Sequence, residues 1–199
     1  MIITIGRECG CNADEIGRML AGKYGIFCYT KVELIQLAKE KGVYEKYPFF
    51  FGEMPVDMMI SPMAESLEER LRNTPQEALE SVLGGEDCVI VGRCANYILK
   101  DKALSLFIYA PFEDALRIFL CGEKEKRIER MMDKHGFSRR KAVKIVEETD
   151  DLRRGYHEYY SGETWGAAHN YDICLDVMRL GKDRVMHIID TALAELIDK

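Results

Sequence analysis

Short apolar runs alternate with helix-like segments along the chain, and this alternation restricts the fold more than any other feature. The first run, Ile2–Ile5, is a β-branched stretch of the kind that forms a strand buried on both faces. We expect the remaining strands at 26–29, 87–91, 104–109 and 171–177. Strands that alternate with helices predict a three-layer α/β sandwich around a five-stranded parallel sheet.

Residues that favour helix ends mark several boundaries. Asn12 or Asp14 can begin the first helix, and Gly25 can end it. Thr30 and Ser138 stand where helices to about residues 41 and 160 would begin. A further helix is expected over 112–132, with an interruption at Cys121-Gly122, and a last one over 183–197.

The segment 44–64 breaks this pattern. It contains the run Tyr47-Pro48-Phe49-Phe50-Phe51 and three of the five prolines. Two interpretations are open: a lid-like insertion, or a loop whose aromatic side chains cover the core.

Composition excludes several classes of protein. The 199 residues suit one domain, and a net charge of −6 gives no global positive field for nucleic acid. Seven cysteines without framework spacing indicate reduced thiols, and Cys9-x-Cys11 lacks the second pair that a zinc site needs. The chain has neither a signal peptide nor an apolar run of about 18 residues, so we expect a soluble cytoplasmic protein without membrane partners.

The loop after the first strand, Gly6–Asp14, has the outline of a phosphate-binding loop. A helix start offers free main-chain N–H groups, and Gly10 would let the chain turn tightly around a phosphate. The usual loop adds a Lys and a hydroxyl, and neither is in place here. On this loop alone, a phosphate site and a plain strand–helix connection are both open.

The chain resembles the cytidylate kinase-like family of P-loop nucleoside monophosphate kinases. The likeness lies in an ordered set of stretches that spans nearly the whole chain: ITIGRECGCNADEIGRMLAGKYGIFCYTKVEL, VIVGRCANYIL, FIYAP, RIERMMDKHGFS, DDLRRGYHEYY and WGAAHNYDICLD. The resemblance implies a single P-loop kinase domain over 1–199, with an acceptor-binding helical insertion at about 31–85 and a lid at about 122–160. It also implies transfer of the γ-phosphoryl group of ATP, with Mg²⁺, to CMP, dCMP or a related small acceptor.

The resemblance assigns the donor phosphates to the first loop. Gly10 holds a glycine position of that loop, Cys11 the Ser position, and Ala13 the position of the Lys. Asn12 replaces a second glycine. The set assigned to the nucleotide is Gly10, Cys11, Asn12, Ala13, Asp14 and Glu15.

Two features of this loop depart from the cytidylate kinase pattern. Asp14 and Glu15 place negative charge beside the phosphates, which repels them unless Mg²⁺ bridges the two. Arg7, just before the turn, is the nearest cation that could replace the Lys, and its fork suits phosphate oxygens.

The pair Gly92-Arg93 matches a pair that belongs to the acceptor site in cytidylate kinases. An Arg at a strand end can bind a phosphate through two hydrogen bonds. Cys94 stands where those kinases have an Asp, so the usual contact with cytosine is missing. The alternative for Arg93 is a structural ion pair.

Arginines of the expected lid form the last group of candidates. Arg127 and Arg130 share one helix face, and we assign them to catalysis together with Arg7 and Arg153. The resemblance assigns the acceptor to Arg93, Asp150, Arg153 and Arg154. The alternative is ordinary solvated helix charge.

Aromatic residues follow these arginines. Tyr156, Tyr159, Tyr160 and Trp165 could stack on a base, but such spacing more often reflects packing against the core, which we favour.

Two other functions remain open from the sequence. A nucleotide-binding sensor without transfer would explain the missing Lys and the added Asp14 and Glu15. A kinase for a different small molecule would explain Cys94 and the unusual 44–64 segment.

Overall fold

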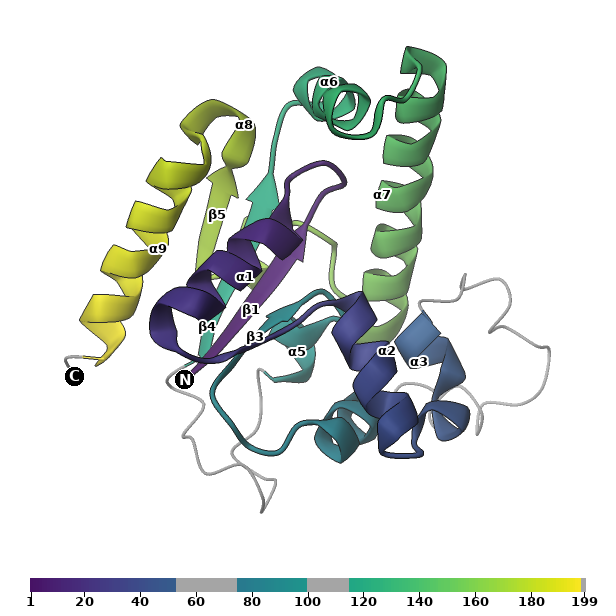
Figure 1. Ribbon diagram of the computed structural model, residues 1–199, viewed down its shortest axis with the longest axis vertical. Coiled ribbons are helices and arrows are strands. Elements are labelled where there is room, and N and C mark those ends of the chain that lie inside the picture. Colours follow the sequence, from purple (N-terminus) through teal and green to yellow (C-terminus); the bar gives the residue numbers. More distant parts are fainter. Residues whose placement is uncertain (53–74, 100–114, 198–199) are drawn as a thin grey trace.

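The structure, a computed structural model, describes residues 1–52, 75–99 and 115–197. Within these ranges one sheet of five parallel strands forms the centre of the molecule, as the sequence predicts (Figure 1). The strands are β1 (Ile2–Arg7), β2 (Phe27–Tyr29), β3 (Cys88–Val91), β4 (Ala115–Cys121) and β5 (Ile173–Asp176). Their order across the sheet is β2-β3-β1-β4-β5, which places β1 in the middle.

Helices cover both faces of the sheet and complete the three layers. They are α1 (Ala13–Tyr24), α2 (Lys31–Glu40), α3 (Pro48–Gly52), α5 (Ala95–Ile98), α6 (Lys124–His135), α7 (Arg139–Ser161), α8 (Val177–Leu180) and α9 (Lys182–Ile197), and residues 75–82 are also helical. Short 3₁₀ turns lie at Tyr44–Lys46 and Ala168–Asn170. None of the helices within the described ranges is long and apolar enough to cross a membrane.

The alternation of side chains along β1 decides which layer each one meets. Ile3 and Ile5 pack in a core with α1 and α9 on one face. Ile2 packs in a second core with α2, α3 and α5 on the other. Because successive side chains of a strand point to opposite faces, the run Ile2–Ile5 supplies both cores, as a strand covered on both sides must.

The helix boundaries predicted at Thr30, Ser138 and Gly25 agree with the structure. The Thr30 side chain accepts a hydrogen bond from the Val32 N–H, and Glu33 completes a capping box at the start of α2. Ser138 accepts from the Lys141 N–H at the start of α7, and Gly25 ends α1 in the left-handed conformation. Asn12 holds the position before α1 without a side-chain cap.

The expected helix over 112–132 is wrong in its first part. Residues Ala115–Cys121 form strand β4, which pairs with both β1 and β5, and α6 begins only at Lys124. A strand buried on both faces shows no alternation, so a run such as Ile118–Cys121 cannot be distinguished from helix by periodicity alone. The strand expected at 104–109 lies outside the described residues.

The described part of the aromatic segment covers the core. Tyr47, Phe50 and Phe51 are buried, and Phe50 contacts the rings of Tyr156 and Tyr160 on α7. This agrees with the second interpretation as far as residue 52; residues 53–64 lie outside the described ranges.

Candidate functional site

The loop between β1 and α1 turns through two left-handed residues. Gly10 has φ +86° and Asn12 has φ +54°. A Cβ on Gly10 would lie 3.0 Å from the main-chain oxygen of Arg127 and 3.1 Å from its Cβ, so only glycine fits this close approach to α6. The loop is therefore shaped by packing against α6.

A carboxylate already binds this loop. Asp150 of α7 accepts the N–H of Cys9 at 2.6 Å and the Nη1 of Arg127 at 2.7 Å. Arg127 also donates to the main-chain oxygens of Cys9, at 2.9 Å, and Gly122, at 2.8 Å. Both charged side chains are buried, at 4% exposed for Arg127 and 7% for Asp150. Burial lowers the pKa of Arg127, but the hydrogen bond and charge of Asp150 outweigh it and hold the pKa above its ordinary value.

Cations from distant parts of the chain surround the same loop. Arg130 donates to the Gly10 oxygen at 3.4 Å, and Lys134 Nζ lies 3.1 Å from the Asn12 Oδ1. Lys182, the first residue of α9, contacts the Glu15 carboxylate at 2.7 Å, and this hydrogen bond lowers the pKa of Glu15. The negative charge that the sequence places at the start of α1 is thus partly offset by lysines that sequence spacing does not reveal.

The corner between β3 and α5 has an unusual main chain. Gly92, Arg93 and Cys94 have φ values of +89°, +62° and +51° in succession. Left-handed conformations in non-glycine residues cost about 1–3 kcal/mol each and gather at functional sites. A Cβ on Gly92 would lie 2.4 Å from the Nη1 of Arg7, so glycine is needed for the Arg7 guanidinium to lie against this corner.

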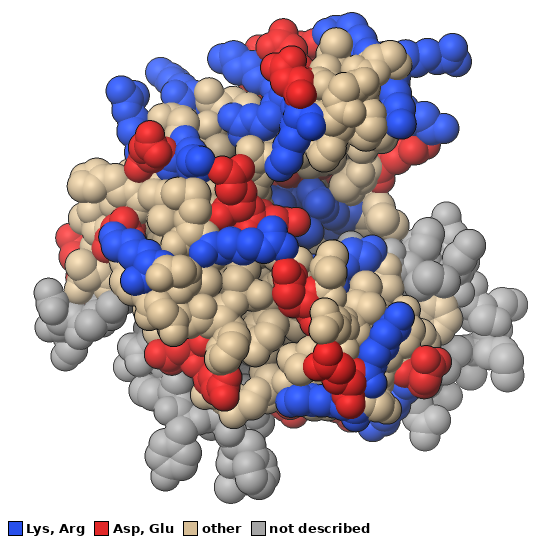
Figure 2. Space-filling model, viewed as in Figure 1, with Lys and Arg blue, Asp and Glu red and all other residues tan. Residues whose placement is uncertain are grey.

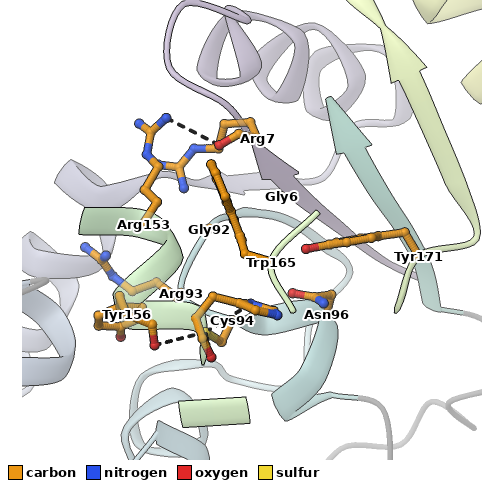
Figure 3. A pocket seen from close by; sticks show the side chains of 11 residues that line it. Gly6, Arg7, Gly92, Arg93, Cys94, Asn96, Arg153, Tyr156, Trp165 and Tyr171 are labelled. Carbon is orange, nitrogen blue, oxygen red and sulfur yellow. Dashed lines mark hydrogen bonds between the residues drawn. The ribbon is translucent and has the colours of Figure 1, made fainter. Parts of the chain in front are cut away.

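A pocket opens beside this corner, at the carboxyl ends of β1 and β3 (Figure 3). Its lining residues are Gly6, Arg7, Gly92, Arg93, Cys94, Asn96, Arg153, Tyr156, His157, Trp165 and Tyr171. Figure 2 shows Lys and Arg side chains filling a hollow of the surface between the β1–α1 loop and α7. Ligands of open α/β sheets bind in this crevice outside the carboxyl ends of the strands.

Three arginines supply the positive charge of the pocket. Arg93, at 2% exposed, donates to the main-chain oxygen of Phe51 at 2.8 Å. Arg153 of α7 donates to the main-chain oxygen of Arg7 at 3.4 Å, which holds the two side chains at one end of the pocket (Figure 3). Three guanidinium groups on one small cavity fit a doubly charged phosphate.

The structure separates the arginines and carboxylates that the sequence grouped together. Arg7, Arg93 and Arg153 line one pocket, whereas Arg127 and Asp150 form a buried pair behind the β1–α1 loop. The positions of the other candidates follow. Arg130 lies at the loop, Arg154 is exposed and paired with Asp151 at 2.5 Å, and Asp14 is exposed.

The side chains of two loop residues point away from any ligand. Cys11 and Ala13 are 1% and 3% exposed and pack in the core with α1. Burial raises the pKa of the Cys11 thiol to about 12, so it stays neutral. Only the main chain of these residues is available to a phosphate.

The aromatic residues divide between the two roles considered for them. Tyr156 and Tyr160 are buried against Phe50, as packing requires, and Tyr156 also lines the pocket. Trp165 lines the pocket and meets the ring of Phe119 edge-on, at 5.5 Å between centroids.

Sequence reasoning missed Asn96, His157 and Tyr171 as pocket residues. Only the position of Asn96, three residues after Arg93, offered a signal.

No group of three or more His, Cys, Asp or Glu side chains within the described ranges is arranged to hold a metal ion.

Comparisons with known proteins identify the family of the chain. The model of the "Cytidylate kinase-like family" matches residues 2–179. A cytidylate kinase of Methanocorpusculum labreanum is 22% identical over 201 residues, which cover 100% of this chain and 99% of the relative.

A solved structure shares the fold. An uncharacterised protein from Eubacterium ventriosum has a TM-score of 0.69 at 27% identity, over 98% of both chains. Shikimate kinase from Bacteroides thetaiotaomicron has a TM-score of 0.46 at 11% identity, over 96% of this chain and 98% of that one.

Proposed function

The chain belongs to the cytidylate kinase-like family, and from this premise we propose that it transfers the γ-phosphoryl group of ATP to CMP, dCMP or a related small phosphorylated acceptor. The observation that carries the proposal is the pocket that Arg7, Arg93 and Arg153 line at the carboxyl ends of β1 and β3. Its position outside the carboxyl ends of the strands is where ligands of open α/β sheets bind.

In this proposal the acceptor phosphate binds the three pocket arginines. Arg93 is fixed by its bond to the Phe51 oxygen, and Arg153 by its bond to the Arg7 oxygen. Side chains held in this way lose little freedom when a phosphate binds, so they position it for attack.

The donor phosphates bind the β1–α1 loop through its main chain. Gly10 and Asn12 have the left-handed turns of an anion-binding concavity, and α1 adds its N-terminal N–H groups. Arg130 and Lys134 on α6 supply the positive charge that the absent loop Lys would give.

The chemical step needs no base from the protein. A dianionic acceptor phosphate oxygen forms a bond to the γ-phosphorus of ATP while the bond from that phosphorus to the bridging oxygen of ADP breaks. No proton is transferred at the reacting atoms, so the arginines act by positioning and by offsetting the charge of the transferring group.

The loop is suited to hold Mg²⁺ only together with a bound nucleotide. Mg²⁺ commonly binds through phosphates, water and one or two carboxylates, and Asp14 and Glu15 are the carboxylates that begin α1. When bound, the ion would neutralise part of the phosphate charge.

A second function, nucleotide sensing without transfer, is favoured by one contact. The Cys9 N–H of the loop is already taken by the Asp150 carboxylate, which is itself bound to Arg127. While the Asp150 carboxylate holds this N–H, the loop has one N–H fewer for the phosphates of ATP. The acceptor pocket does not depend on this contact and can still bind its ligand.

A coupled assay with ATP, Mg²⁺ and a panel of nucleoside monophosphates, together with calorimetric titration of each ligand, separates these functions. Turnover with CMP or dCMP is the expected result. Binding without turnover would support the sensor, and turnover only with another phosphorylated compound would support a different acceptor. No binding of any nucleotide at millimolar concentration would overturn both the kinase and the sensor.

A further inference from the structure

Two buried polar side chains line the pocket, and Figure 3 shows Asn96 away from the Arg7 and Arg153 pair. Asn96 and His157 are 5% and 4% exposed. Within the part of the chain that the structure describes, the Asn96 Nδ2 and the His157 Nε2 have no hydrogen-bond partner. A buried polar atom left without a partner costs about 1–3 kcal/mol, so two of them on one cavity indicate atoms that a ligand satisfies.

The surroundings of His157 determine whether its imidazole donates or accepts a hydrogen bond in the pocket. Burial lowers the pKa of its imidazole, so the ring is neutral at pH 7 and carries one N–H. Its Nδ1 lies 3.5 Å from the Cys94 sulfur, and that sulfur is 3.9 Å from the main-chain oxygens of Tyr156 and His157. We assign the tautomer in which the Cys94 thiol donates to one of these main-chain oxygens, the His157 Nδ1–H donates to the sulfur, and Nε2 is left as an acceptor.

The walls between the two ends suit a flat ring. Trp165 lies between the arginine end and Asn96 in Figure 3, and Tyr171 lies beside Asn96. Burial raises the pKa of Tyr171 well above its ordinary range, so its hydroxyl remains neutral. The cavity thus has a cationic end that suits a phosphate, an aromatic wall that suits the face of a base, and a polar end that suits the edge of that base.

We propose that Asn96 and His157 determine the specificity of the acceptor pocket by binding the polar edge of the acceptor's base, with a pattern that fits cytosine and rejects uracil. This inference rests on the proposed phosphate transfer to a nucleoside monophosphate. Asn96 donates from Nδ2 to the ring N3 or O2, and the His157 Nε2 accepts from the exocyclic amino group. Uracil places a carbonyl oxygen where cytosine has the amino group, so two acceptors would meet at His157.

The proposal also assigns to Cys94 a role that the sequence did not indicate. A thiol cannot bind the amino group of a base as a carboxylate does. Its contact with the His157 Nδ1 instead fixes the tautomer and ring orientation. In this proposal Asn96 and His157 contact the base in place of residue 94. Cys94 acts as a positioning residue for His157.

Calorimetric titration with CMP, UMP and ribose 5-phosphate, a probe without a base, tests the assignment. The wild-type protein is expected to bind CMP at least about tenfold more tightly than UMP, because an unmatched buried polar contact typically costs that much. Asn96→Ala and Asn96→Asp should each weaken CMP binding about tenfold and leave ribose 5-phosphate unchanged, with Lys144→Ala on the exposed face of α7 as the control. His157→Gln, which keeps a side-chain acceptor, should bind CMP better than His157→Leu.

Several outcomes would overturn the proposal. Equal binding of CMP and UMP by the wild-type protein would exclude reading of the base edge. Equal weakening of CMP and ribose 5-phosphate in the Asn96 variants would make Asn96 a structural residue. In both cases phosphate binding and transfer would remain, so the proposed function would stand. If ribose 5-phosphate and CMP both fail to bind the wild-type protein, the proposed function falls as well.

Discussion

Two strand–helix corners lie side by side at the carboxyl edge of the sheet, and they are built in opposite ways. The β1–α1 loop has left-handed residues at Gly10 and Asn12, and the β3–α5 corner has them at Gly92, Arg93 and Cys94. At the first corner an internal ion pair takes one residue of the loop, since Asp150 accepts the Cys9 N–H and Arg127 donates to the Cys9 oxygen. The second opens onto a pocket that three arginines line.

The two corners differ in where their positively charged side chains come from. At the β3–α5 corner the cation is part of the corner itself, and Arg93 is oriented by the strained main chain. At the β1–α1 loop the cations come from α6 and α9, which are far away in the sequence. We infer that the acceptor side is built into the sheet edge, whereas the donor side depends on how the α6–α7 pair packs against the loop.

The largest effect is expected at the buried pair of the first corner. Asp150→Ala leaves the Cys9 N–H without its acceptor and leaves buried Arg127 with only the Glu8 carboxylate, 3.3 Å from its Nε, so it should lower the free energy of unfolding by about 3 kcal/mol. Urea unfolding measures the change. Asp151→Ala, which breaks the exposed pair with Arg154, is the control and should cost less than about 1 kcal/mol. Similar losses in the two variants would show that Asp150 does not hold the loop.

The next effect is expected at the second corner. Arg93→Ala should reduce kcat/KM for the acceptor about a hundredfold, because a charge-assisted contact with the phosphate is lost from a dry pocket. ATP affinity, measured by titration, should remain within about twofold. Arg93→Lys keeps the charge and should recover only part of the activity. Equal loss of ATP and acceptor binding would assign Arg93 to the fold instead.

Neighbouring arginines of α7 give a matched test of which side chain serves the acceptor. Arg153 lines the pocket and contacts Arg7, whereas Arg154 is exposed and paired with Asp151. Arg153→Ala should raise KM for the acceptor about tenfold, and Arg154→Ala less than about threefold, since an exposed charge is screened by solvent. Steady-state kinetics with CMP measure both. The reverse order would place the acceptor outside the pocket.

The smallest effect is expected at the distant cations of the loop. Lys134→Ala should weaken ATP binding about threefold and leave CMP binding unchanged, because an exposed lysine contributes a solvent-screened charge. Titration at low and moderate salt checks this, and the difference should shrink as salt rises. A loss confined to CMP would contradict the division between the two corners.

Much of the fold could be predicted because its signals are local. The capping box at Thr30, the cap at Ser138 and the glycine at the end of α1 depend on neighbours in the chain. Strand β4 could not be assigned because an apolar strand covered on both faces lacks a distinguishing period. The family resemblance located both corners, but it also grouped Arg127 with Arg153, although only Arg153 lines the pocket.

The sequence by itself determined the parallel α/β sandwich, the two corners and the family, since these follow from periodicity, turn residues and ordered motifs. Only the tertiary structure decided which charges meet. Ion pairs such as Arg127 with Asp150 and Lys182 with Glu15 join residues 23 and 167 positions apart, and no spacing rule relates them. The same holds for Asn96 and His157, whose shared pocket exists only because α7 packs across the end of β3. Burial gives a polar atom its energetic importance, and burial is a property of the packed molecule.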